Sequence, residues 1–229
     1  MKKIGLIMGT SWESSKEYYA IINKLVNKKL GGQNCAEMIM VNINFEEVNI
    51  NLKNNDWKSM TLLIENAAHV LEKAGADFYL ICTNTLHNCV DNYSKEIQIP
   101  LLHIADATAR AIQKDKVKKV LLLGTKATMS LDFYKKKLSD FGIEVIVPNN
   151  EDMNYIDSVI FNEMCKGKFL EESKKGFLNI IEKSKKDGAQ GVVLACTEIP
   201  MLIEQKDSNI PLYDTMTLHA VEAVEYALK

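Results

Sequence analysis

The sequence lacks the features that mark several common classes of protein. Its 229 residues include 4 prolines and 5 cysteines, and no two cysteines form a CxxC pair. An odd number of irregularly spaced cysteines argues against a disulfide framework or a zinc site. No apolar run approaches the roughly 18 residues of a membrane helix. The signatures GxGxxG and GxxxxGK[ST] are also absent, so the common dinucleotide and phosphate loops are not expected.

Neither sign of charge is in excess. The chain has 28 Lys and Arg residues against 30 Asp and Glu residues, a formal net charge of -2. Neither nucleic acid nor a membrane is therefore expected as a partner. The N-terminal apolar run ends at Gly9, which is too early for a signal peptide. We expect this run to be a first buried strand and the protein to be cytoplasmic.

Short apolar runs alternate with segments of helical period. The predicted strands cover residues 4–8, 38–43, 78–82, 117–123, 143–147 and 192–196. The predicted helices cover residues 12–30, 57–74, 105–113, 129–141, 171–186 and 217–228. Continuous apolar strands between helices predict an α/β fold with parallel sheets flanked by helices. In such sheets, sites form at the carboxyl ends of the strands.

An internal duplication is the most informative feature of the sequence. Three short motifs recur in the same order, 111 to 115 residues apart: Gly9-Thr10 with Gly124-Thr125, Gly75-Ala76 with Gly188-Ala189, and Ile99-Pro100-Leu101 with Ile210-Pro211-Leu212. A repeat of this kind predicts two similar α/β lobes related by a pseudo-two-fold axis. We expect residues 1–100 plus 212–229 in the first lobe, residues 101–211 in the second, and an active site in the cleft between them.

The register of the duplication selects two side chains. Cys196 lies seven residues after Ala189, and Thr83 lies seven residues after Ala76. Neighbouring strand residues point to opposite faces. If Cys196 faces a site, Thr83 is expected to face one too, and Cys82 is expected to face away.

Two such groups can exchange protons with opposite faces of one tetrahedral carbon, which is a two-base stereoinversion. The developing negative charge needs hydrogen-bond donors, and loops that follow strands and begin helices favour anions. The donors that we expect to bind substrate are Thr10, Asn84, Thr85, Thr125 and Thr197. We expect Glu198 to orient either the substrate or Cys196.

Three motifs resemble the signatures of the cofactor-independent aspartate/glutamate racemase family. They are Met8-Gly9-Thr10, Cys82-Thr83-Asn84-Thr85-Leu86-His87 and Ala195-Cys196-Thr197-Glu198-Ile199, and Asp106-Ala107-Thr108 and Gly124-Thr125-Lys126-Ala127-Thr128 also fit. The resemblance implies two α/β lobes, a homodimer, an amino-acid substrate, no cofactor and two opposed catalytic cysteines. The chain most resembles the subgroup with Thr in place of the first cysteine, which is associated with L-aspartate and L-glutamate.

The sequence departs from the wider family at further positions. The opening motif is not Gly-Gly-Met, and residues 46–53 contain no arginine, which several aspartate racemases use on the distal carboxylate. Cys165 stands where relatives often have lysine. Lys53 and Lys166 are the candidates to replace these cations.

Thr83 changes the expected mechanism, because a threonine hydroxyl is a weak base. His87 is its nearest helper in sequence, or else a hydrogen-bonded structural histidine, and His103 and His219 are further candidates. A cleft can lower the pKa of the Cys196 thiol. We therefore expect a slow racemase in which Cys196 exchanges the α-proton of the L-substrate quickly.

Two other functions fit the same residues. One is the isomerisation or decarboxylation of another small carboxylate on the same fold. The other is a catalytically impaired protein that binds small anions, although such a binder gains little from keeping Cys196.

Overall fold

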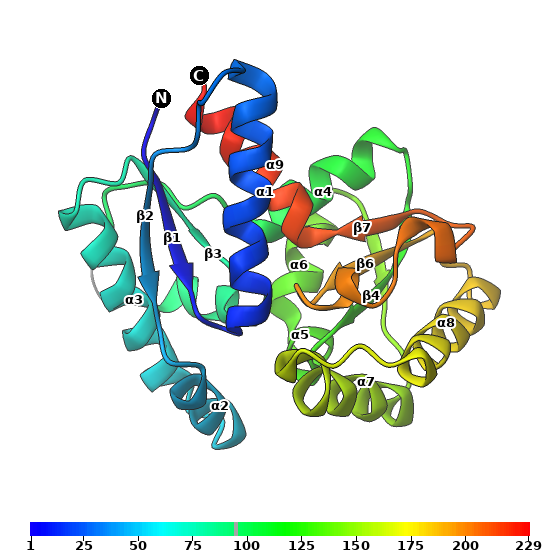
Figure 1. Ribbon diagram of the computed structural model, residues 1–229. Coiled ribbons are helices and arrows are strands. Elements are labelled where there is room, and N and C mark those ends of the chain that lie inside the picture. The colour runs from blue at the N-terminus through cyan, green and yellow to red at the C-terminus, as the bar shows by residue number, and fades with distance from the viewer. Residues whose placement is uncertain (94–95) are drawn as a thin grey trace. The chain divides into compact units, whose positions relative to one another are not determined.

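The computed structural model describes residues 1–93 and 96–229, which group into two compact units (Figure 1). The first unit contains Met1–Ile104 and His219–Lys229, and the second contains Ala105–Leu218. The sequence places residues 212–218 in the first lobe. They belong instead to the second unit, because Leu212–Asp214 forms a strand of its sheet.

The first unit has a parallel sheet of three strands in the order β2-β1-β3. These strands are β1 (Ile4–Met8), β2 (Met38–Asn42) and β3 (Phe78–Ile81). Leu101 adds a single parallel bridge to Tyr79. The helical elements are α1 (Trp12–Leu30), α2 (Phe45–Lys53), α3 (Trp57–Lys73), the 3-10 segment η1 (Thr85–Asn92) and most of α9 (Thr215–Ala227).

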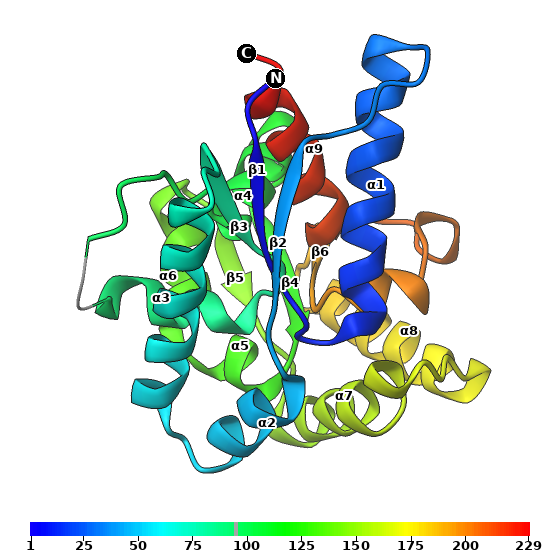
Figure 2. The ribbon, with the colours of Figure 1, turned by 60° about the vertical axis from the view of Figure 1, so that its left-hand side comes forward.

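Helices cover both faces of this sheet, with α3 on one side and α1 and α9 on the other (Figure 2). Ile64 and Leu71 of α3 are fully buried in one cluster with Ile7 and other strand side chains. On the opposite face, Phe78 meets the Tyr226 ring of α9 at a centroid distance of 4.8 Å. The strands are therefore apolar throughout, as the sequence predicts.

The second unit has a parallel sheet of four strands in the order β5-β4-β6-β7. These strands are β4 (Lys119–Gly124), β5 (Glu144–Ile146), β6 (Gly191–Ala195) and β7 (Leu212–Asp214). The helical elements are α4 (Ile104–Lys114), α5 (Lys126–Ser130), α6 (Asp132–Asp140), α7 (Asn150–Asn162), η2 (Met164–Lys166), α8 (Glu171–Lys186), η3 (Ile199–Met201) and η4 (Gln205–Asp207).

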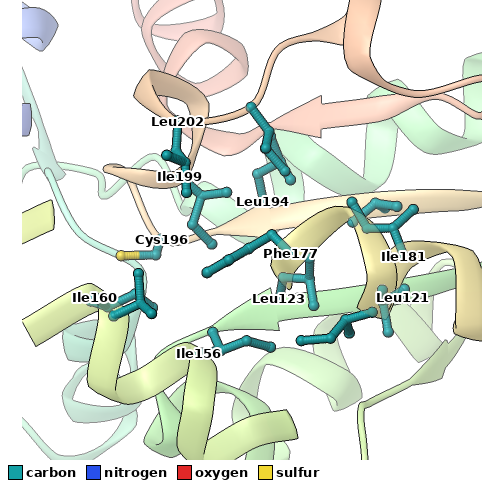
Figure 3. Close-up of a cluster of buried hydrophobic side chains, with 14 of the residues drawn as sticks. Leu121, Leu123, Ile156, Ile160, Phe177, Ile181, Leu194, Cys196, Ile199 and Leu202 are labelled. Atoms are coloured by element: carbon teal, nitrogen blue, oxygen red, sulfur yellow. The ribbon is translucent and has the colours of Figure 1, made fainter. Parts of the chain in front are cut away.

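One face of this second sheet packs against α7 and α8 (Figure 3). Leu121 and Leu194 point from the strands into a cluster with Ile156 of α7 and Phe177 of α8. Cys196 lies at the end of the same cluster, just after β6 ends. This packing decides the surroundings of the thiol.

The duplicated glycine-alanine pairs end equivalent helices in the same way. Gly75 after α3 has a φ of 85°, and Gly188 after α8 has a φ of 91°. In each case the following alanine, Ala76 or Ala189, donates its N–H to the last helical turn at 3.0 Å. Both helices therefore end in a Schellman motif, which requires a glycine with positive φ.

The duplicated Ile-Pro-Leu segments give the two strands the same register. The N–H of Tyr79 donates to Pro100 O at 3.0 Å, and the N–H of Val192 donates to Pro211 O at 2.8 Å. The separation of these donors equals that of the glycine-alanine pairs. Cys196 therefore occupies the position in the second repeat that Thr83 occupies in the first.

The structure differs from the predicted elements in several regions. The predicted helix over 129–141 is split into α5 and α6, because Leu131 is extended (φ -74°, ψ 158°). Helices α2 and α7 were not predicted. Both begin after an asparagine N-cap, Asn44 or Asn149, and carry acidic residues in the first turn, which is a start signal that the sequence does contain.

Gly9 is expected to be essential for stability. Its φ is 98°, and a Cβ there would collide with the Ile43 carbonyl oxygen. Gly9→Ala should lower the free energy of unfolding in urea by about 3 kcal/mol or more. Gly31→Ala is the matched control, because Gly31 has a φ of 72° but no atom lies within 4 Å of the place that a Cβ would occupy. A loss no larger than that control's, about 1–2 kcal/mol, would contradict the collision.

Candidate active site

The candidate site residues of the first unit lie at the carboxyl ends of β1 and β3. Thr83 is partly exposed, whereas its neighbour Cys82 is fully buried, and burial raises the pKa of the Cys82 thiol. Hydrogen bonds hold both the N–H and the carbonyl of Thr83. Its N–H donates to Ile81 O at 2.8 Å, and its carbonyl accepts from Nδ1 of His87 at 2.8 Å.

Three further polar side chains accompany Thr83 in this unit. Asn84 and Thr85 begin η1 and are buried, and Thr10 follows the neighbouring strand β1. Thr10 is 7% exposed, and its Oγ1 has no hydrogen-bond partner within residues 1–93 and 96–229. A buried hydroxyl without a partner costs free energy. A ligand that accepts from Thr10 would remove that cost.

His87 is not placed to act as a base on the Thr83 hydroxyl. A carbonyl only accepts, so Nδ1 of His87 carries the proton that it donates to Thr83 O. The Ile104 N–H donates to Nε2 at 3.3 Å, so that nitrogen is unprotonated. Burial, and then the nearby His103 and His219, hold the pKa of His87 well below its usual value. His87 is therefore a neutral, fully engaged side chain.

His219 is also neutral and engaged. It is fully buried, its Nε2 donates to Leu102 O at 2.8 Å, and its Nδ1 accepts from the Tyr18 hydroxyl at 3.0 Å. Burial lowers the pKa of His219 to about 4. His103 is half-buried, and the centroid of its ring lies 4.4 Å from the centroid of the His87 ring. The three histidines form one cluster in the first unit, and both ring nitrogens of His219 are used by bonds within that unit.

The candidate site residues of the second unit lie at the carboxyl ends of β4 and β6. Cys196 Sγ donates to Oε2 of Glu198 at 3.0 Å, and Thr197 Oγ1 donates to the same oxygen at 3.2 Å. All three side chains are buried. Thr125 follows β4 and caps α5, where its hydroxyl accepts from the Thr128 N–H at 3.2 Å.

The thiol of Cys196 is protonated at neutral pH. It is 7% exposed and packs among apolar side chains, with Ile160 of α7 beside it (Figure 3). Burial, and then electrostatic interaction with Glu198 and Cys165, raise the pKa of Cys196 well above its usual value. The expectation that the site lowers this pKa was wrong, because the thiol faces an apolar cluster and a carboxylate rather than a cation.

The Cys196–Glu198 contact defines the chemistry open to these residues. In the resting protein Cys196 is an acid whose proton already lies on a hydrogen bond to a carboxylate. The Glu198 carboxylate is the group placed to accept that proton, and the thiolate is the form of a cysteine that acts as a base. Sequence reasoning gave Glu198 a role toward either substrate or Cys196, and the structure shows its contact with Cys196.

The proposed replacements for the missing cations are both exposed. Lys53 is the last residue of α2, and Lys166 ends η2. Cys165, next to Lys166, packs against the cluster that contains Cys196. Sequence reasoning missed this proximity, because α7 and η2, the elements next to and around Cys165, were not predicted.

Metal sites and membrane spans are both absent from the part of the chain that the structure describes. Across residues 1–93 and 96–229, no group of three or more His, Cys, Asp or Glu side chains is arranged to hold a metal ion. Within the same ranges, no helix combines the length and the apolar character needed to cross a membrane.

Comparison with known proteins decides the family. The sequence model of the Asp/Glu/hydantoin racemases matches residues 7–223. The chain belongs to this family. A provisionally assigned Asp/Glu racemase from Yersinia pestis is 40% identical, with a TM-score of 0.91 and full coverage of both chains. An aspartate racemase homologue from Pyrococcus horikoshii is 37% identical, with a TM-score of 0.85 and the same coverage.

One relative in the sequence comparison is named for its enzymatic activity. The broad-specificity amino-acid racemase RacX of Bacillus subtilis is 25% identical over 169 residues, which cover 74% of this chain and 73% of the relative. The solved structures establish that the two parallel sheets with flanking helices are the fold of this family.

The raised pKa of Cys196 predicts slow alkylation. At pH 8 iodoacetamide should modify exposed Cys35 at least about tenfold faster than Cys196, because the thiolate is the reacting form. Glu198→Gln removes a nearby negative charge and should speed the modification of Cys196. Peptide mass spectrometry over time measures both rates. Equal rates for Cys35 and Cys196 in the unaltered protein would contradict the assigned protonation state.

Proposed function

We propose that the chain is a cofactor-independent amino-acid racemase that acts on aspartate or glutamate, with Cys196 and Thr83 as its proton-transfer groups. The observation that carries the proposal is the shared register of the two repeats. It gives Cys196 and Thr83 equivalent places after β6 and β3. Family membership and the names of the relatives support the reaction class.

The proposed reaction begins at the Cys196–Glu198 hydrogen bond. The Cys196 thiol passes its proton to Glu198, and the resulting thiolate removes the α-proton of the L-amino acid. The α-carbon then holds the electron pair of the broken C–H bond as an enolate-like anion. Return of the proton from Cys196 regenerates the L-form. Delivery of a proton by Thr83 to the other face gives the D-form; water then reprotonates the oxygen of the partly exposed Thr83, and Glu198 returns its proton to solvent, which restores the resting protonation states.

The polar side chains at the strand ends would bind the substrate and its developing charge. Each well-placed donor contributes roughly 2.7–4 kcal/mol to such a charged transition state. Thr10 is the strongest candidate, because its buried Oγ1 has no partner in the described chain. The other proposed binding residues are Asn84, Thr85, Thr125 and Thr197. Lys166 is the candidate for the distal carboxylate, because it adjoins Cys165 in the Cys196 cluster.

Thr83 should make the two half-reactions unequal. Two enantiomers have equal free energy in water, so a weak Thr83 cannot make the enzyme act in one direction. It lowers inversion in both directions, by up to the roughly 10²–10⁴-fold that a general acid–base group contributes. Exchange of the α-proton by Cys196 alone does not need Thr83. We therefore expect a slow racemase with faster α-proton exchange on the L-substrate.

The proposal predicts an inequality of rates in heavy water. Proton NMR should show deuterium entering L-aspartate or L-glutamate faster than the D-enantiomer forms. Thr83→Cys should speed inversion, and Cys196→Ala should abolish exchange. Cys82→Ala is the control that should retain both rates, because Cys82 is buried and its equivalent in the second repeat is Ala195. Equal rates of exchange and inversion in the unaltered protein would refute the proposal that Thr83 is a weaker proton-transfer group than Cys196.

The same assay separates the alternative functions. An isomerase or decarboxylase of another small carboxylate would leave amino acids unexchanged and convert its own substrate class. A small-anion binder would bind L-aspartate or L-glutamate with no exchange of the α-proton.

A further inference from the structure

His87 holds a position that the proton-transfer steps above do not use. It is buried, yet both ring nitrogens bond to backbone atoms of two different segments. Nδ1 binds the carbonyl of Thr83, and Nε2 accepts the N–H of Ile104, the first residue of α4. A single imidazole therefore ties the Thr83 turn to the start of α4.

Two hydrogen bonds hold the Thr83 backbone: the bond of its carbonyl to His87 and the bond of its N–H to Ile81. The Thr83 N–H is bound to Ile81 O at 2.8 Å, so His87 completes the restraint by holding the carbonyl. The ring itself is held by its own backbone, since the His87 N–H donates to Asn84 O at 3.1 Å. With its peptide groups held on both sides, the Thr83 side chain projects from a fixed turn.

The second repeat has no equivalent of this tie. The position that corresponds to His87 is Pro200, which has neither a side-chain donor nor an acceptor. After Cys196, the strand-end carbonyl is bound instead by the Ile199 N–H at 3.1 Å. The histidine is thus specific to the repeat whose proton-transfer group is the weaker one.

We propose that His87 is a positioning residue for Thr83, acting through the Nδ1–H bond to the Thr83 carbonyl rather than by proton transfer. The inference rests on the proposed function, because it assigns His87 to the half-reaction that Thr83 completes. His87 affects inversion, which needs Thr83, and leaves the exchange by Cys196 in place. A poorly held general acid loses efficiency, because displacements of about 1 Å cost up to 10²-fold in rate.

Two amide variants separate the two bonds of His87. Asn places its side-chain NH₂ near the position of Nδ1 and can donate to Thr83 O, but it does not reach Ile104. Gln places its carbonyl oxygen near the position of Nε2 and can accept from the Ile104 N–H, but it does not hold Thr83. His87→Asn and His87→Gln are therefore a matched pair that keep different halves of the tie.

The experiment measures inversion and L-substrate exchange for both variants in heavy water. His87→Asn should keep inversion within about threefold of the unaltered protein, and His87→Gln should lower it about tenfold or more. L-exchange should change less than about twofold in either. Equal losses of inversion in the two variants, or a parallel loss of exchange, would overturn the positioning role.

A second readout does not depend on catalysis. The ¹³C shift of the Thr83 carbonyl should move in the Gln variant and stay in place in the Asn variant. Equal movement in both would overturn the inference on structural grounds. Absence of both exchange and inversion in the unaltered protein would instead refute the proposed racemase, and the carbonyl shift would still decide whether His87 holds Thr83.

Discussion

The register of β3 in one parallel sheet and of β6 in the other decides which side chains follow the carboxyl ends of these strands. Backbone bonds to Pro100 and Pro211 set β3 and β6 at the same register, and Schellman motifs start both strands from equivalent glycines. Successive strand residues point to opposite faces, so a slip of one residue would replace Cys196 by Ala195. The identity of the side chain at each strand end, Thr83 or Cys196, therefore depends on backbone hydrogen bonds made several residues earlier in the strand.

Burial then fixes the protonation of the groups that the register selects. Cys196 is a thiol bonded to Glu198, and His87 and His219 are neutral imidazoles bonded to backbone carbonyls. Each of these buried groups rests in its uncharged form, as expected where desolvation penalises charge. In the proposed reaction, proton transfer to Glu198 moves the negative charge of this pair from the carboxylate to the Cys196 sulfur.

Sequence reasoning was most successful for the bounds and the register of the strands, which depend on local apolar pattern and backbone hydrogen bonds. Apolar runs predicted β1, β3, β4 and β6 to within about two residues, and the count from the glycine-alanine pairs gave the register of Thr83 and Cys196. It failed where side chains from distant segments meet. The pKa of Cys196 depends on Ile160 and Cys165, which lie on segments that the sequence did not predict. The state of His219 depends on Leu102, 117 residues away.

The central proposal is that Cys196 and Thr83 are equivalent proton-transfer groups of the two repeats. Exchanging them in the triple variant Thr83→Cys, Thr85→Glu, Cys196→Thr tests this most directly, because Thr85 is the equivalent of Glu198 and the new thiol then has its carboxylate. In heavy water the account predicts that the faster α-proton exchange moves from the L-enantiomer to the D-enantiomer, because the thiol and its carboxylate now stand in the other repeat. A folded triple variant that still exchanges the L-enantiomer faster, or that exchanges neither, would contradict it.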